Sequence, residues 1–81
     1  MDAVALLSRN LKRLRRLRGN ISQEALADKA GVNRTYMGKI ENGAHSVGLK
    51  TVDKLAKALG VRACDLIDPD FEPSPIKDRP N

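Results

Sequence analysis

Apolar residues recur every three or four positions along most of the chain, which is the spacing of one face of an α-helix. The first such run consists of Val4, Leu7, Leu11 and Leu14, and Leu17 continues it. The spacing predicts five helices, expected at residues 3–18, 23–30, 34–42, 49–59 and 63–67. No alternating pattern typical of a β-strand occurs, so the predicted fold class is all-α.

Cap and turn residues separate the second helix from the third. Ser22 and Asn33 have side chains that cap helices well, because their oxygens accept hydrogen bonds from first-turn backbone N–H groups. Gly31 suits the left-handed conformation in which many helices end. Two short helices joined by a glycine-containing turn predict a helix-turn-helix unit. Each is too short to be stable alone, so both are expected to pack on the flanking helices.

The length of 81 residues allows one small domain. We expect this domain to comprise residues 1–68. Residues 69–81 are expected to form a flexible tail, because from Asp70 onward the chain has three prolines, mixed charge and only two large apolar residues. Large cofactor-binding folds and multidomain enzymes do not fit in this length.

Charge is distributed unevenly. Residues 1–60 hold 12 basic and 5 acidic side chains, a balance of +7, whereas residues 61–81 hold 3 and 5, a balance of −2. A basic body with an acidic end indicates an anionic partner for the body. Charge alone leaves open whether that partner is a nucleic acid or a membrane.

The residue types of metal and catalytic sites are scarce. Cys64 is the single cysteine, so no internal disulfide forms, which fits a reducing cytoplasm. It has no partners at metal-ligand spacing, and we expect it to be at least partly buried. No serine, histidine and acid are spaced as a catalytic triad, so neither an enzyme nor a cofactor is predicted. No apolar run approaches the ~20 residues of a membrane span.

The motifs around the predicted helix-turn-helix resemble those of the Cro/cI-type (Xre-like) family. They are Ser22-Gln23 at the start of the second helix, Ala30-Gly31 in the turn, and Ile40-Glu41-Asn42-Gly43 at the end of the third. The resemblance covers roughly residues 11–67 and implies a compact five-helix, lambda-repressor-like DNA-binding domain. In size the chain is similar to restriction–modification controller proteins and small phage-type repressors.

The resemblance also implies roles for individual residues. The positions that meet DNA bases in the family hold Arg34, Thr35 and Lys39. The positions that meet the DNA backbone hold Gln23, Tyr36, Asn42 and Lys50. Arg15 and Glu41 match a structural ion pair of the family. The sequence departs from the family at Gly38, on the reading face, where many relatives carry a side chain.

The leading hypothesis is a cytoplasmic, nucleoid-associated transcriptional regulator that binds double-stranded DNA as a homodimer on a palindromic site. Leu66 and Ile67 are expected at the dimer surface. One alternative is a DNA-binding module whose main partner is a protein, as in an antitoxin. Another is a membrane-surface binder that uses its basic, leucine-striped first helix. No membrane partner is favoured, because the small core needs those leucines, and the length leaves no room for a small-molecule effector domain.

Overall fold

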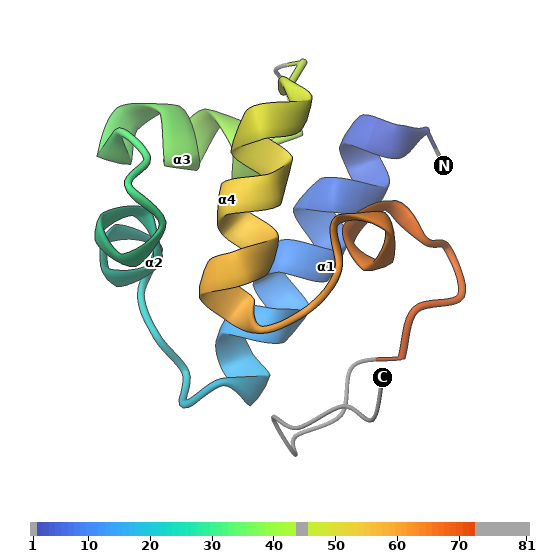
Figure 1. Ribbon diagram of the computed structural model, residues 1–81, viewed down its shortest axis with the longest axis horizontal. Coiled ribbons are helices and arrows are strands. Elements are labelled where there is room, and N and C mark those ends of the chain that lie inside the picture. The colour runs from blue at the N-terminus through green and yellow to red at the C-terminus, as the bar shows by residue number, and fades with distance from the viewer. Residues whose placement is uncertain (1, 44–45, 73–81) are drawn as a thin grey trace.

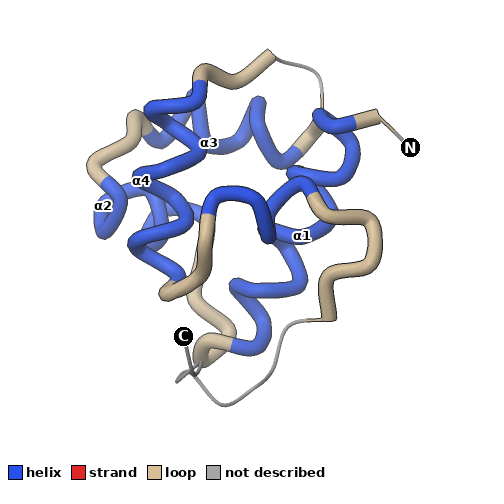
Figure 2. Tube along the Cα trace, turned by 45° about the vertical axis from the view of Figure 1, so that its right-hand side comes forward, coloured by secondary structure: helices blue, strands red, loops and turns tan. Residues whose placement is uncertain are grey.

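The computed structural model describes residues 2–43 and 46–72, and within them all regular structure is helical (Figure 2). Four α-helices are followed by one short 3-10 helix, η1. Their bounds are α1 Ala3–Leu17, α2 Gln23–Ala30, α3 Arg34–Glu41, α4 Leu49–Leu59 and η1 Ala63–Ile67. The prediction of an all-α fold is confirmed, but the count of five α-helices is not, because the last element winds as a tighter 3-10 helix.

Helix α4 stands in the middle of the molecule in Figure 1, with α2 and α3 on one side and α1 and η1 on the other. Its main contacts are with α2 and η1, while α3 packs on both α1 and α2. The helix-turn-helix pair is therefore held from two directions. α1 supports α3, and α4 supports α2.

The core gathers apolar side chains from every helix. The buried members include Leu11 and Leu14 of α1, Leu26 of α2, Met37 and Ile40 of α3, Leu55 and Leu59 of α4, and Leu66 of η1. Leu17, expected to extend the α1 stripe, is instead exposed. It is the last residue of α1, so the neighbouring helices do not cover it.

A buried polar residue of α1 holds η1 and the segment directly after it against the domain. Asn10 is completely buried, and its Nδ2 lies 3.1 Å from the carbonyl oxygen of Leu66 and 3.2 Å from that of Asp68. Phe71 follows and is buried in the core, although the sequence placed it in the flexible tail. Arg13 donates to its carbonyl oxygen at 3.2 Å. The remainder of the predicted tail, 73–81, lies outside the described residues.

The helix ends lie within one residue of their predicted positions. Ser22 Oγ accepts from the backbone N–H of Ala25 at 3.0 Å, and Asn33 Oδ1 accepts from that of Tyr36 at 3.1 Å. Gly31 closes α2 in the left-handed conformation, with φ of 73°. A side chain would strain the backbone there, so this glycine permits the sharp turn into α3.

The burial of individual side chains tests three predictions about the protein surface. Cys64 is exposed, so the prediction that it is partly buried is wrong: its position on η1 faces away from the core. Leu66 is fully buried and therefore lies inside the domain, whereas Ile67 is 41 % exposed. The buried leucines of α1 are unavailable to a membrane surface. Within the described part of the chain, no helix is both long and apolar enough to span a bilayer.

Candidate nucleic-acid interface

Helix α3 presents one face to the core and the other to solvent. Met37 and Ile40 are fully buried and set the rotation of the helix about its axis. This rotation leaves Arg34, Thr35 and Lys39 exposed, so all three predicted base-contact residues lie on the accessible surface of α3. The face begins at the helix N-terminus, the end that meets base edges in helix-turn-helix proteins.

An ion pair fixes α3 against α1. Arg15 donates from Nε to Glu41 Oε2 at 2.7 Å and from Nη2 to Glu41 Oε1 at 2.8 Å. The Glu41 side chain is 1 % exposed and the Arg15 side chain 19 %. Hydrogen bonding to this carboxylate raises the pKa of Arg15 above its usual value, outweighing the opposite effect of burial. The pair predicted from the sequence is thus present, with the bidentate geometry that makes such pairs strong.

Gln23 joins this ion pair from α2. Its Nε2 donates to Glu41 Oε1 at 3.1 Å, and the side chain is half-buried. Arg15 also donates from Nη1 to the carbonyl oxygen of Ile21 at 2.8 Å, just before α2 begins. The Glu41 carboxylate therefore connects α1, α2 and α3. It sets the position of Gln23 at the N-terminus of α2, where backbone N–H groups favour an anion.

Arg34 has a set of partners that sequence reasoning missed. Its Nε lies 3.2 Å from Asp28 Oδ1, its Nη2 lies 2.8 Å from Asp28 Oδ2, and its Nη1 lies 3.5 Å from Glu24 Oε1. The available signal was the position of Asp28 on the last turn of α2, six residues before Arg34 and facing it across the glycine turn. The two acids stand one helical turn apart, where like charges repel unless a cation lies between them.

The pair of Asp28 and Arg34 persists at neutral pH. Hydrogen bonding to the guanidinium lowers the pKa of Asp28 below its usual value of 3.8, outweighing the opposing effect of desolvation, and the charge of Arg34 lowers it further. A lowered pKa means that the pair stabilises the fold above the ordinary aspartate pKa. Its contribution is lost as the pH falls through the folded-state pKa of Asp28.

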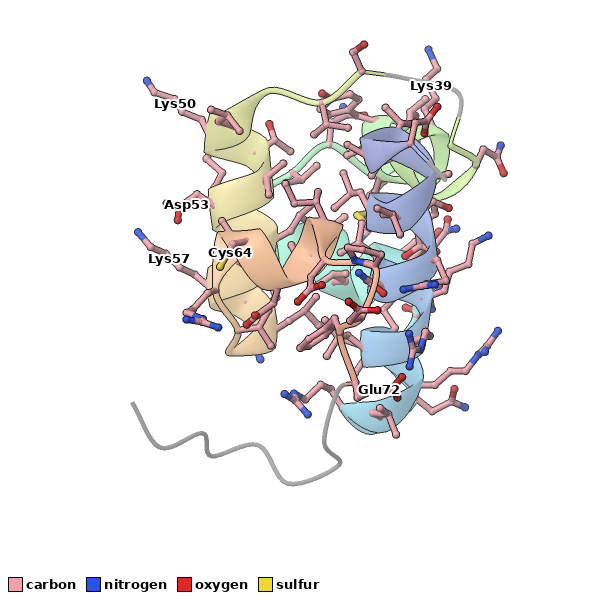
Figure 3. The ribbon with its side chains drawn as sticks, turned by 90° about the vertical axis from the view of Figure 1, so that its right-hand side faces the viewer. Lys39, Lys50, Asp53, Lys57, Cys64 and Glu72 are labelled. Carbon is pink, nitrogen blue, oxygen red and sulfur yellow. The ribbon has the colours of Figure 1, made fainter. Side chains whose placement is uncertain are left out.

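The other residues predicted to contact the DNA backbone differ in how far they are buried. Tyr36 is half-buried against the core, while Asn42 is exposed and caps the C-terminus of α3. Lys50 is exposed on the first turn of α4. In Figure 3, Lys39 and Lys50 stand out at the same end of the molecule, and the acidic Glu72 lies at the opposite end. The fold thus brings two lysines, eleven residues apart in sequence, to one end.

Basic side chains of α1 lie beside the end of α3. A hollow of about 420 Å³ is lined by Asn42 and Gly43 at the end of α3 and by Arg9, Lys12 and Arg16 of α1. Arg9 is partly engaged, since its Nη2 donates to the carbonyl oxygen of Pro69 at 3.0 Å. The arrangement suits a polyanion. Among the described residues, no group of His, Cys, Asp or Glu side chains could hold a metal ion.

The family model described as helix-turn-helix matches residues 11–66 of the chain. The chain belongs to the helix-turn-helix family. The family consists of DNA-binding regulators, and the chain is accordingly a DNA-binding transcriptional regulator. It is 40 % identical over 63 residues to the control protein C.BamHI of Bacillus amyloliquefaciens, an alignment that covers 78 % of each chain.

Solved structures of other members have the same fold. The restriction–modification controller protein C.AhdI of Aeromonas hydrophila superposes with a TM-score of 0.72 at 36 % identity, covering 78 % of this chain and 94 % of that one. A hypothetical transcription factor from Neisseria superposes with a TM-score of 0.78 at 36 % identity, covering 85 % of this chain and 78 % of that one. The whole helix-turn-helix unit and its supporting helices are thus shared.

Gly38, the residue that departs from the family pattern, is not required by the fold. A Cβ placed there meets only Gln23 Oε1, at 3.7 Å, which is an ordinary contact. Glycine inside a helix costs about 1 kcal/mol relative to alanine. We therefore expect Gly38→Ala to raise the free energy of unfolding by about 1 kcal/mol, measured by urea denaturation. A lower value would instead mean that the fold needs open space at this position.

Proposed function

We propose that the chain is a dimeric regulator that reads a palindromic operator through the major groove, as a repressor or as a controller of a restriction–modification system. The observation that carries this proposal is the exposed N-terminal face of α3, held rigidly by the buried Glu41 carboxylate that α1 and α2 share. Rigid support matters, because base readout depends on placing donors accurately against the base edges.

In this proposal α3 lies in the major groove and α2 crosses the DNA backbone. Arg34 donates to guanine, Thr35 offers its hydroxyl or methyl group, and Lys39 reaches a guanine or a phosphate. Backbone contacts set the register and much of the affinity. They come from Gln23, Tyr36, Asn42 and Lys50.

Two copies are proposed because one recognition helix reads only a few base pairs. Half-sites one turn of DNA apart, about 34 Å, match a two-fold dimer. An apolar groove of about 260 Å³ supports a surface for this contact; Leu49, Cys64 and Ile67 line it, together with Val4 and Val47. Leu49 is 82 % exposed, and the groove lies on α1, α4 and η1 rather than on α3. A self-complementary apolar patch is what a two-fold interface requires.

Charge on this groove is expected to separate the two copies. The variants Leu49→Glu and Ile67→Glu should shift the protein from dimer to monomer in light scattering at micromolar concentration, with the helical fold retained because neither side chain is buried in the core. Leu17→Glu is the matched control, since Leu17 is exposed outside this groove. Dimers that survive both groove substitutions would contradict this interface.

Selection of bound sequences from random duplex DNA tests the function directly. We expect an enriched inverted repeat whose half-sites are about one helical turn apart. An enriched single half-site would contradict the dimer. No enriched sequence, together with co-purification of a tight protein partner, would instead support a module whose main partner is a protein.

A further inference from the structure

The guanidinium of Arg34 is hydrogen-bonded along one edge by Asp28, and on the remaining edge Nη1 lies 3.5 Å from Glu24 Oε1. Asp28 accepts from Nε at 3.2 Å and from Nη2 at 2.8 Å, a two-point contact that fixes the plane of the group. The side chains remain accessible, with 59 % of Arg34 and 58 % of Asp28 exposed. The pair is therefore a surface feature with room for a further ligand.

Donor geometry determines what that ligand can be. A guanidinium has five N–H donors in a rigid fork, and Asp28 occupies the edge formed by Nε and one N–H of Nη2. The remaining edge, formed by Nη1 and the second N–H of Nη2, presents two parallel donors. Guanine offers two matching acceptors, O6 and N7, in the major groove. Arg34 can thus keep Asp28 while it binds guanine once the exposed Glu24 side chain leaves Nη1.

The negative charges beside Arg34 also bear on what this side chain binds. Residues 1–60 contain only five acidic side chains, and two of them, Glu24 and Asp28, lie against Arg34 at the helix-turn-helix. Carboxylates at this position oppose attraction to phosphate in any DNA sequence. These two carboxylates therefore do not add to the affinity for DNA phosphates.

We propose that Asp28 is a specificity-determining positioning residue, whose carboxylate holds Arg34 on one edge so that the other edge selects guanine. This inference rests on the proposed function. Asp28 acts through Arg34 and touches no base itself. Its negative charge also weakens binding to sequences that lack the guanine, because a phosphate contact by Arg34 must then be made beside a carboxylate.

The test compares full-length Asp28→Asn with the wild type on three duplexes at one salt concentration. These are the selected operator, the operator with adenine in place of the guanine, and random DNA. We expect discrimination between guanine and adenine to fall by about 5- to 10-fold, with binding to random DNA unchanged or tighter. Asp28→Glu keeps the charge and should restore part of the discrimination.

Matched variants separate positioning from charge and folding. Asp53→Asn removes the same charge from an exposed carboxylate on α4, paired with Lys57, and should leave discrimination unchanged. Glu24→Gln removes the more distant carboxylate, 3.5 Å from Nη1, and should have a smaller effect than Asp28→Asn. In an Arg34→Ala background, Asp28→Asn should cause no further loss of discrimination, because the residue to be positioned is gone.

Three results would overturn the inference. The Asp28→Asn variant could keep the wild-type discrimination between guanine and adenine. The control Asp53→Asn could also lose as much of this discrimination as Asp28→Asn does. Alternatively, Asp28→Asn could tighten binding to the operator itself, which would mean that Asp28 competes with DNA for Arg34. Failure of the proposed function looks different, because the wild type would then enrich no sequence and both ideas would be wrong.

Discussion

Arg15→Ala is expected to lower the free energy of unfolding by about 3 kcal/mol. The substitution removes two donors from Glu41, whose side chain is 1 % exposed, and leaves a buried carboxylate for which Gln23 is the remaining side-chain donor among the described residues. Removing one partner of a buried ion pair is costly because the other charge stays unpaired. In a domain of this size the loss corresponds to a fall of roughly 12–24 °C in melting temperature, measurable by calorimetry.

An exposed ion pair provides the control for this experiment. Lys57 and Asp53 lie one turn apart on α4 at 3.2 Å, with side chains 78 % and 55 % exposed. Lys57→Ala is expected to change stability by less than about 0.5 kcal/mol. A double variant, Arg15→Met with Glu41→Met, should recover much of the loss, because it leaves no unpaired charge. A loss for Arg15→Ala no larger than that for Lys57→Ala would contradict the structural role of the pair.

Arg34→Ala is expected to weaken binding to the operator by about 5- to 150-fold, or about 1–3 kcal/mol. Repeating the selection from random DNA with this variant should show relaxed preference at one position in each half-site. The reason is that a bidentate contact to guanine rewards one base, whereas a phosphate contact rewards none. The measurement is binding affinity for the operator and for random duplex DNA at a single salt concentration.

Gln23→Ala is the comparison for Arg34→Ala. Gln23 lies at the N-terminus of α2, the helix proposed to cross the DNA backbone, so its loss should weaken specific and random complexes more evenly. An equal loss on operator and random DNA for Arg34→Ala would show that Arg34 contacts only phosphate. The inference about Asp28 would fall with that result.

Local chemistry made the helix-turn-helix predictable from sequence. Ser22 and Asn33 cap α2 and α3 through hydrogen bonds to residues only three positions away, and Gly31 supplies the left-handed turn on its own. Signals that span only a few residues can be recognised without knowledge of the rest of the fold. The pairing of Arg15 with Glu41 spans 26 residues and was expected only because of a family resemblance.

Burial was harder to predict for residues at the end of a helix or after the last helix. Leu17 continues the stripe of α1 by periodicity, yet it is exposed at the last turn of the helix. Phe71 follows Asp68-Pro69 in a polar, proline-rich stretch, yet it is buried because Asn10 and Arg13 hold that segment against α1. Periodicity identifies one face of a helix, but not how far the neighbouring elements extend along it.

The sequence by itself therefore determined the all-α class, the helix-turn-helix and the exposure of Arg34, Thr35 and Lys39, because each follows from spacing and capping within a few positions. Only the tertiary structure decided which side chains contact these residues and their supporting helices. It places Asp28 against Arg34, and the Glu41 carboxylate between Arg15 and Gln23. The pairing of Glu41 with Arg15 depends on how the helices pack around one core, and no local pattern encodes that arrangement.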